Sequence, residues 1–291
     1  MTEALIAELP RRGVVAVSGP DALSFLDNLL TSNVDAAGDG RAVFAGLLSP
    51  QGKLLFDFII FRDHDERYLL DVAQGAVDGL LKRLQMFRLR AKVEFADLSD
   101  ERIVVAAWGS DRPPQLDGVV APDPRLAALG FRAIVPPGAD MAPDFAESTQ
   151  GQYDAHRIVL GVPEGGIDFA FGDAFPHDAD MDDLAGVDFA KGCFVGQEVV
   201  SRMKHRGTAR RRVVIGHGAN LPPAGSEVAA GGKPIGTLGS SSGDTALALV
   251  RIDRAREAMD ARVPILAGGT PITLTIPAWA TFDWPAVIDP E

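Results

Sequence analysis

The chain has 291 residues with a formal net charge of −12, and 46% of its residues are hydrophobic while 23% are charged. This composition is typical of a soluble globular protein and excludes intrinsic disorder and a collagen-like fold. The length allows two or three domains, and the acidic balance argues against salt-driven binding of nucleic acid over the whole surface.

Signals for membranes or export are weak in this chain. The longest apolar run, residues 54–61, contains Asp57 and is far shorter than the roughly 20 residues of a membrane span. Residues 1–10 carry acidic side chains and lack both a basic and an apolar targeting region, so we expect no signal or transit peptide. Cys193 is the only cysteine and cannot form an internal disulfide, which is typical of a reducing compartment. These features predict a cytoplasmic protein.

The first predicted elements are a short strand and an amphipathic helix. Residues 14–17 form an apolar run, and Ser18-Gly19-Pro20-Asp21 then supplies residue types that favour a helix start. The apolar side chains of this helix share one stripe: Leu23, Leu26, Leu29 and Leu30.

A β-hairpin is predicted next. Residues 42–48 and 53–62 resemble strands, and the turn-forming Ser49-Pro50-Gln51-Gly52 separates them. Alternation along the second strand puts Asp57 on a face with Ile59 and Phe61 that should be buried. A buried carboxylate without partners would cost several kcal/mol. Two interpretations stay open: Asp57 meets a backbone N–H or an arginine and is structural, or it faces a ligand.

The following region alternates strands and helices. Helical spacing of apolar residues predicts a helix over 77–87, and the pattern predicts a second helix over 152–160. A connector rich in proline and glycine spans residues 110–144 and includes a short helix at 124–129. Strands are expected at 68–72, near 93–95, at 103–108 and at 131–135. This order indicates an α+β architecture.

Two segments of opposite charge follow. Seven aspartates lie between residues 168 and 188, and basic residues dominate from 191 to 212. In one interpretation these segments form a solvated surface with mutual ion pairs. In the other, the basic residues form a rim that attracts an anionic ligand, such as a folate glutamyl tail, an acidic partner or RNA phosphates. The basic segment lacks interleaved aromatic residues, which makes RNA the weakest of these.

The last part of the chain has short apolar strands separated by turn residues, which predicts a small β-barrel or sandwich. The predicted strands are 212–215, 226–229, 234–238, 245–250, a segment at Val263, and 272–276.

One stretch contains most of the candidate reactive residues and reads Lys191-Gly-Cys-Phe-Val-Gly-Gln-Glu-Val-Val-Ser-Arg202. Cys193 lies between Gly192 and Gly196, just before a run with helical character. The positive end of a helix dipole and the ammonium of Lys191 would both favour a reactive thiolate. Glycine tolerates positive φ and lets the backbone approach a partner closely. The alternative is that Cys193 is a small buried hydrophobe.

This signature, Lys-Gly-Cys-Phe-x-Gly-Gln-Glu-x-x-Ser-Arg, resembles that of the YgfZ-type folate-binding proteins of the GcvT-like superfamily, which include the mitochondrial assembly factor for [4Fe-4S] enzymes. Residues 17–34 are similar to the same family and to the folate-dependent aminomethyltransferases of the glycine cleavage system. The segment Arg157-Ile-Val-Leu-Gly161 is similar to the family's Arg-x-x-x-Gly, and residues 236–240 and 246–251 to its C-terminal barrel. The resemblance spans nearly the whole chain.

The resemblance implies an α+β, GcvT-like multi-lobed fold with ferredoxin-like α+β lobes and a C-terminal β-barrel. Residues 1–50 and 145–206 would form a first lobe that carries Cys193, residues 51–144 a second lobe, and residues 207–291 the barrel.

The resemblance also implies a function. The protein would be a folate-binding accessory factor that supports assembly or repair of [4Fe-4S] proteins through Cys193. Tetrahydrofolate would be its cofactor, and iron-sulfur assembly proteins or client [4Fe-4S] enzymes its partners. Lys191 and Arg202 would keep the thiol anionic, Gln197 and Glu198 would orient the loop, and Asp57 and Arg202 would contact the folate. The full signature set is Lys191, Gly192, Cys193, Gly196, Gln197, Glu198 and Arg202.

Two alternatives stand beside this interpretation. One is a folate-dependent aminomethyl or one-carbon transferase with Asp57 as the key carboxylate. The aspartate usual beside it in those enzymes is Phe56 here, and the position matching their pterin-binding glutamate is Val159. A signature centred on a cysteine also argues against transferase chemistry, which needs no thiol. The other alternative is a structural scaffold that docks partners through its charged segments.

A resident metal ion is not predicted. His177, His205 and the nearby carboxylates match no standard zinc spacing. One cysteine cannot hold an iron-sulfur cluster within the chain. If iron and sulfur are handled here, a partner or a second subunit must supply further ligands.

Overall fold

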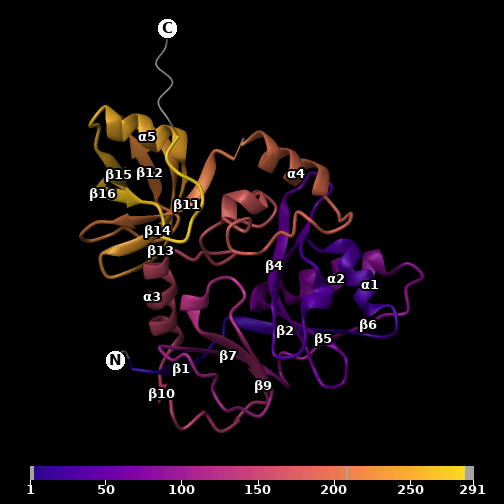
Figure 1. Ribbon diagram of the computed structural model, residues 1–291. Coiled ribbons are helices and arrows are strands. Elements are labelled where there is room, and N and C mark those ends of the chain that lie inside the picture. Colours follow the sequence, from indigo (N-terminus) through magenta and orange to yellow (C-terminus); the bar gives the residue numbers. More distant parts are fainter. Residues whose placement is uncertain (1–2, 208, 286–291) are drawn as a thin grey trace. The chain divides into compact units, whose positions relative to one another are not determined.

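The computed structural model describes residues 3–207 and 209–285 of the chain (Figure 1). Met1 and Thr2, which begin the predicted first lobe, and residues 208 and 286–291 of the predicted barrel lie outside the described residues. The chain divides into two compact units, Met1–Tyr153 with Leu184–Glu198, and Asp154–Asp183 with Val199–Glu291.

The first unit contains an antiparallel sheet with the strand order β3-β4-β5-β2-β6. Its strands are β2 (Arg12–Ser18), β3 (Val43–Leu48), β4 (Leu54–Arg62), β5 (Tyr68–Ala73) and β6 (Glu94–Asp97). The predicted hairpin is present as β3 and β4, with a register shift next to the turn between Leu47 and Leu48.

Two helices pack against one face of this sheet, α1 (Ala22–Leu29) and α2 (Val77–Arg88). Phe58 and Ile60 of β4 and Leu80 and Leu84 of α2 are buried in the shared apolar core. The predicted stripe of the first helix is partly wrong, because Leu23 is exposed and Phe25 is buried in its place. Since successive helical residues are about 100° apart, Leu23 turns away from the face that Leu26 and Leu29 share.

A second sheet of the first unit has the order β10-β1-β7-β9-β8. Its strands are β1 (Leu5–Glu8), β7 (Ile103–Trp108), β8 (Val119–Pro122), β9 (Phe131–Val135) and β10 (Ala146–Glu147). Strands β7 and β9 were expected from the sequence, whereas β1, β8 and β10 were not. These three have at most four residues each, too few for alternation to be recognised.

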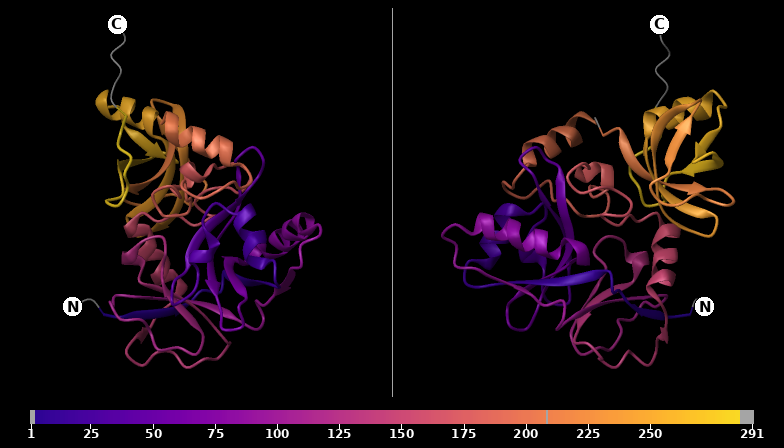
Figure 2. Two further views of the ribbon diagram at one scale, coloured as in Figure 1. Left: turned by 45° about the vertical axis from the view of Figure 1, so that its right-hand side comes forward. Right: turned by 180° about the vertical axis from the view of Figure 1, so that it is seen from behind.

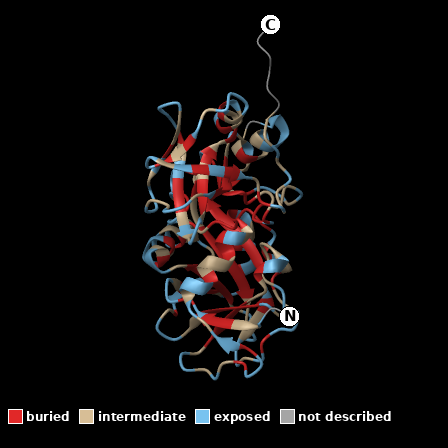
Figure 3. Ribbon diagram, turned by 90° about the vertical axis from the view of Figure 1, so that its left-hand side faces the viewer, coloured by how far each residue is buried: buried red, intermediate tan, exposed pale blue. Residues whose placement is uncertain are grey.

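Short helical segments complete this part of the chain. The helix expected at 124–129 is reduced to a 3-10 turn, η3 (Ala127–Leu129), and the other 3-10 turns here are η1 (Val34–Ala36) and η2 (Gln74–Ala76). Helix α3 (Gln150–Leu160) confirms the helix predicted over 152–160. Burial coloured along the chain in Figure 3 shows the strands as mostly buried and the connecting loops as mostly exposed.

The second unit contains a closed barrel with the order β11-β14-β13-β12-β15-β16. Its strands are β11 (Arg211–His217), β12 (Glu227–Ala230), β13 (Lys233–Ser242), β14 (Thr245–Arg251), β15 (Ile265–Ala267) and β16 (Thr270–Thr275). The unit also holds η4 (Pro176–Ala179) and α5 (Ile252–Asp260). The predicted barrel is therefore confirmed, while the strand expected at Val263 begins two residues later.

Helix α5 was missed because its buried positions carry small side chains. Ile252, Ala255 and Ala258 face the barrel core at helical spacing, and most other positions are charged. Two alanines add little to an apolar pattern, although their spacing of three is the usual mark of a helical face. The α+β fold with a C-terminal barrel is confirmed, and the predicted lobe boundaries at residues 50, 144 and 206 stay a prediction.

Candidate functional site

We define the Cys193 loop as residues 186–196, which belong to the first unit and lead into helix α4 (Gln197–Arg206). Asp188 shapes the start of this loop. Its Oδ1 accepts hydrogen bonds from the backbone N–H groups of Ala190 at 2.8 Å and Lys191 at 3.2 Å. An aspartate in such a turn supplies the partners that irregular backbone lacks. The loop therefore has a defined path before it reaches the cysteine.

Thr31 ties the loop to the sheet. This fully buried residue donates from Oγ1 to the carbonyl of Gly186 at 2.6 Å and accepts from the N–H of Gly46 at 2.7 Å. Its own carbonyl accepts from the N–H of Asp188 at 2.9 Å. Because Thr31 follows α1 and Gly46 lies on β3, one hydroxyl joins three segments that are distant in sequence.

Lys191 is a buried anchor of the loop. Its Nζ donates to the carbonyls of Asp27 at 2.7 Å, Ser32 at 2.9 Å and Leu30 at 3.0 Å, and lies 3.1 Å from Asp27 Oδ1. Its side chain is only 4% exposed. An ammonium has three N–H donors, so these acceptors occupy all of them. The sequence interpretation put this charge beside the thiol, but here its donors satisfy the carbonyls around the end of α1.

The residues after the cysteine are also held. Phe194 is buried, with its ring centroid 5.9 Å from Lys191 Nζ, and Val195 packs against the helix-covered core. Gly196 has a φ of +81°, and a Cβ there would lie 2.6 Å from the carbonyl oxygen of Ser49 in the hairpin turn. A Cβ at Gly192 would meet no described atom within 4 Å. Close backbone approach therefore explains the second signature glycine and not the first.

Cys193 itself is exposed. It lies between the buried ammonium of Lys191 and the buried ring of Phe194, so the contacts on both sides of it fix the backbone. The interpretation of Cys193 as a small buried hydrophobe does not hold. An exposed thiol on an anchored loop can reach a second molecule without any local unfolding.

The remaining signature residues lie on α4. Gln197 is half-buried and Glu198 is exposed in the first turn, where a negative charge favours the helix. Arg202 is exposed further along the helix, in the part assigned to the second unit. Their assigned roles in orienting the loop and in binding folate stay predictions.

The start of the Cys193 loop and the residue before it line a pocket of about 560 Å³ in the first unit. Ala185, Val187 and Asp188 contribute to it, together with Ser32 and Phe44. Most of these side chains are small or apolar, and the pocket adjoins the segment whose carbonyls hold Lys191.

Asp57 is buried on β4, as its place in the alternation predicted. It pairs with Gly46 of β3, and its face of the sheet is the one opposite the helices. Asp71 of β5 lies on the same face, since it pairs with Ile59, two residues from Asp57. The structure therefore puts Asp57 and Asp71 on the same buried face, and the role of Asp57 toward a ligand stays a prediction.

A buried polar cluster on this side of the sheet was missed by the sequence reasoning. Asp71 is fully buried and accepts from Arg12, and Arg132 donates to Tyr153 Oη at 2.8 Å. Burial alone would raise the pKa of Asp123, but Arg125 and Arg132 outweigh it and hold that pKa below its ordinary value. The signal was available, because Asp71 and Arg132 interrupt apolar strands as Asp57 does.

The opposite charges flanking the signature pair with each other inside the second unit. We call the group His177, Asp178, Asp180, Asp182, Arg211 and Arg212 the Arg212 cluster. Arg212 binds Asp182 through both carboxylate oxygens, at 2.6 and 3.0 Å, and donates to the carbonyl of His177 at 2.9 Å. Arg211 donates to Asp178 at 2.7 Å. For these residues the predicted ion pairs are confirmed, but the predicted solvated surface is wrong, because Asp178, Asp180 and Arg212 are buried.

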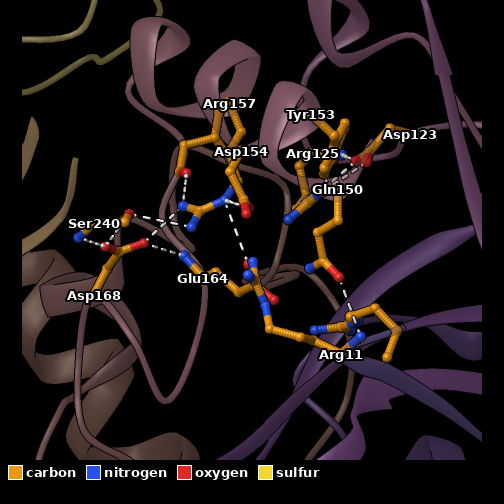
Figure 4. Close-up of polar contacts among 12 residues, drawn as sticks. Arg11, Asp123, Arg125, Gln150, Tyr153, Asp154, Arg157, Glu164, Asp168 and Ser240 are labelled. Carbon is orange, nitrogen blue, oxygen red and sulfur yellow. Dashed lines mark hydrogen bonds and ion pairs between the residues drawn. The ribbon is translucent and has the colours of Figure 1, made fainter. Parts of the chain in front are cut away.

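Arg157 anchors a second polar network, shown in Figure 4. Its guanidinium donates to Asp168 at 2.8 Å and to Asp154 at 3.0 Å, and Asp168 also accepts from the hydroxyl of Ser240 on β13 at 2.6 Å. The arginine of the Arg-x-x-x-Gly segment is therefore part of a buried polar network in this structure. Val159, in the same segment, is 63% exposed and has no polar side-chain atom.

Within residues 3–207 and 209–285, no group of three or more histidine, cysteine, aspartate or glutamate side chains is arranged to hold a metal ion. In the same ranges, no helix has the length and apolar character needed to cross a membrane.

Comparison with known protein families matches two parts of the chain. The GCVT N-terminal domain matches residues 2–136, and the CAF17 C-terminal β-barrel domain matches residues 210–282. The crystal structure of the glycine cleavage system aminomethyltransferase T from Bartonella henselae superposes with a TM-score of 0.71, covering 94% of this chain and 85% of that one at 17% identity. The similarity confirms the GcvT-like fold.

Curated relatives carry a more specific name. A protein of Mycosarcoma maydis is 36% identical over 225 residues, 72% of this chain and 56% of its own length. A Neurospora crassa protein is 32% identical over 230 residues, 72% of this chain and 52% of its own. Both are named "Iron-sulfur cluster assembly factor IBA57 homolog, mitochondrial". The chain thus spans about half the length of the curated relatives it matches.

These names correct the predicted location. The relatives are named as mitochondrial, which contradicts the cytoplasmic location expected from the sequence. The expectation rested on the composition of residues 1–10 and on the single cysteine, and the lack of an internal disulfide does not distinguish one reducing compartment from another.

Proposed function

The chain belongs to the GcvT-like superfamily and to its IBA57/CAF17 family, and from this premise we propose that it is an accessory factor in iron-sulfur protein assembly that works through Cys193. One observation carries the proposal. Cys193 is exposed on a loop that Thr31, Lys191 and Gly196 hold in place, so the sulfur is the reactive atom that the signature presents.

The chemistry open to one thiol is limited. A [4Fe-4S] cluster is held by four thiolates, so Cys193 would supply one ligand to a cluster in transit while a partner supplies the rest. Alternatively, the thiolate would exchange with a disulfide of a client protein. In both cases Lys191 acts on backbone position, because its three N–H groups are occupied. The partners would be iron-sulfur assembly proteins or client [4Fe-4S] enzymes.

Tetrahydrofolate fits this chain only in part. Asp57 is a buried carboxylate on the sheet face that also carries Asp71. Val159 cannot make the paired hydrogen bonds that a glutamate would offer to the edge of a pterin, and Phe56 stands where the aminomethyltransferases have a second aspartate. The residues present therefore do not reproduce that binding set, and no step of the proposed function runs through folate.

The test replaces the thiol. In cells that lack this protein, the full chain with Cys193→Ser should fail to restore the activity of [4Fe-4S] enzymes, although the variant accumulates to the normal level. Asp57→Asn serves as the matched control and should restore that activity. A Cys193→Ser chain that restores it fully would overturn the proposal.

Folate is tested separately. Calorimetric titration of the purified chain with tetrahydrofolate, under reducing conditions, measures binding directly, and a one-carbon transfer assay measures any turnover. We expect no transfer. Turnover that Asp57→Asn abolishes would instead establish the transferase alternative.

A further inference from the structure

Residues 82–92, which we call the α2 basic turn, have the opposite charge to the rest of the molecule. The sequence Lys-Arg-Leu-Gln-Met-Phe-Arg-Leu-Arg-Ala-Lys carries five cations and no acidic residue, within a chain whose formal net charge is −12. The segment covers the second half of α2 and the connection to β6. Figures 1 and 2 show that this connection projects as a loop before the chain returns as β6.

The five cations have no ionic partners in the parts of the chain that the structure describes. Lys82, Arg83, Arg88, Arg90 and Lys92 form no ion pair with residues 3–207 or 209–285. A cation in the last turn stabilises a helix through its dipole, which accounts for Arg88. It does not account for Lys82 and Arg83, which lie more than a turn before the helix end. Nor does it account for Arg90 and Lys92, which lie beyond that end.

Two large apolar side chains lie among these charges. Leu89 is 90% exposed and Met86 is 68% exposed, whereas their neighbour Leu84 is completely buried in the core. Isolated exposed apolar residues are common on protein surfaces. Two of them, three positions apart and surrounded by unpaired cations, have the composition of an interaction surface, where methionine and arginine are enriched.

The backbone shows that the fold does not require a leucine at position 89. Arg88 to Ala91 form a tight turn, with a hydrogen bond from the N–H of Ala91 to the carbonyl of Arg88 at 2.8 Å. Leu89 has φ +43° and ψ −104° and is the first central residue of this turn. That conformation belongs to type II′ turns, in which glycine is strongly preferred. Position 89 therefore holds a side chain that contacts little of the protein, although glycine would adopt this conformation with less strain.

We propose that the α2 basic turn is a docking surface for an acidic protein partner. Leu89 and Met86 would enter an apolar recess on the partner, and the cations would face carboxylates around that recess. The five cations favour an acidic surface. The exposed apolar pair favours a protein over another polyanion, because a polyanion without an apolar recess would not bury Leu89 and Met86. The proposal goes beyond the function assigned to Cys193 and does not depend on it.

Other polyanions fit less well. Single-stranded nucleic acid is bound by exposed aromatic rings, and the aromatic residue of this segment, Phe87, packs against the core. A helix that lies on a membrane presents a continuous apolar face to the lipid, and the apolar face of α2 is buried in the protein through Leu80 and Leu84.

The first experiment places a photoreactive benzoylphenylalanine at position 89 of the full chain in living cells. Irradiation should attach a protein, and the cross-linked peptide of that protein, identified by mass spectrometry, should be rich in aspartate and glutamate. The same amino acid at the exposed Glu101 is the control and should not yield that product. A chain that also carries Cys193→Ser should give the product unchanged, which separates this surface from the thiol.

The second experiment measures the affinity of the purified captured protein. Leu89→Gly should weaken binding about tenfold or more, as expected for a residue at the centre of an interface, without lowering the melting temperature of the chain. Arg88→Gln combined with Arg90→Gln should weaken binding and reduce its salt dependence. Asp78→Asn, at the other end of α2, is the matched control.

Several results would overturn the proposal. In the cross-linking experiment, these are a yield no higher than that of the Glu101 control, or a product with a second copy of this chain or with RNA. In the binding experiment, it is an affinity that Leu89→Gly leaves unchanged. Binding of the chain to phosphatidylserine vesicles that Leu89→Gly abolishes would also overturn it.

Discussion

The Cys193 loop and the Arg212 cluster come from adjacent parts of the sequence and use buried cations for different purposes. In the loop, the ammonium of Lys191 is held by neutral carbonyls with Asp27, and the chemically distinctive group beside it is exposed. In the cluster, Arg212 is matched by carboxylates that are themselves buried. The loop is organised to present a side chain, whereas the cluster is organised to hold η4 against β11.

The largest effect is expected from breaking the cluster. Arg212→Met would remove the cation that binds the buried carboxylates of Asp182 and Asp180, and would leave Asp182 only the more distant Lys204 at 3.8 Å. Removing one partner of a buried ion pair costs about 3–5 kcal/mol. We expect a loss of that size in the free energy of unfolding, measured by denaturant titration of the full chain.

The control for this prediction is an exposed pair. Arg254 and Glu257 are separated by 3.1 Å on α5, and both are more than half exposed. Arg254→Met should therefore change the free energy of unfolding by less than about 1 kcal/mol. Equal losses in the two variants would mean that the burial of Arg212 does not set its contribution.

A smaller loss is expected from the loop. Gly196→Ala would place a Cβ 2.6 Å from the carbonyl of Ser49 in a backbone conformation with φ +81°. Such strain costs about 1–3 kcal/mol, and relief would require the loop to move off the hairpin turn. We expect lower stability by denaturant titration together with reduced rescue of [4Fe-4S] enzymes. Gly192→Ala is the matched control, and a comparable loss there would refute the role assigned to the hairpin contact.

The sequence predicted the fold well where apolar side chains recur over many residues with the period of a strand, as in β4, or of a helix, as in α2. It failed for α5, whose core positions are alanines, and for β1 and β10, which are too short. Within the site, the uniqueness of Cys193 and its two glycines identified the loop. The role of Lys191 could not be read, because its acceptors lie about 160 positions earlier in the chain. Tertiary contacts of this kind leave no local pattern.

The third prediction concerns pH and tests the cluster without breaking it. Burial raises the pKa of Asp180 well above its ordinary value, against the opposing effect of Arg212. A carboxyl with a raised folded pKa stabilises the protein below its unfolded pKa, and this contribution is lost as pH rises through the folded pKa. Asp180→Asn removes the titration and keeps a hydrogen-bonding side chain. Its stability relative to the natural chain should rise with pH above about 4.

The pKa of the neighbouring Asp182 is shifted in the opposite direction, and this residue provides the comparison. Hydrogen bonds from Arg212 outweigh its burial and lower its pKa. Its contribution is complete above the unfolded pKa of about 4 and is lost as pH falls through the folded pKa, so Asp182→Asn should lose stability relative to the natural chain as pH rises toward about 4 and change little above it. Denaturant titrations over a series of pH values measure both slopes, and two slopes of the same sign would contradict the assignment.

The smallest effect on stability is expected at Cys193, the residue with the largest expected effect on function. Its side chain is exposed, so Cys193→Ser should change the free energy of unfolding by no more than about 0.5 kcal/mol. The same exposure predicts that a disulfide reagent modifies the folded chain without waiting for an unfolding event. Its rate should be independent of low denaturant concentrations. A rate that rises with denaturant would show that the thiol must first be uncovered, and the loop would then share the buried character of the Arg212 cluster.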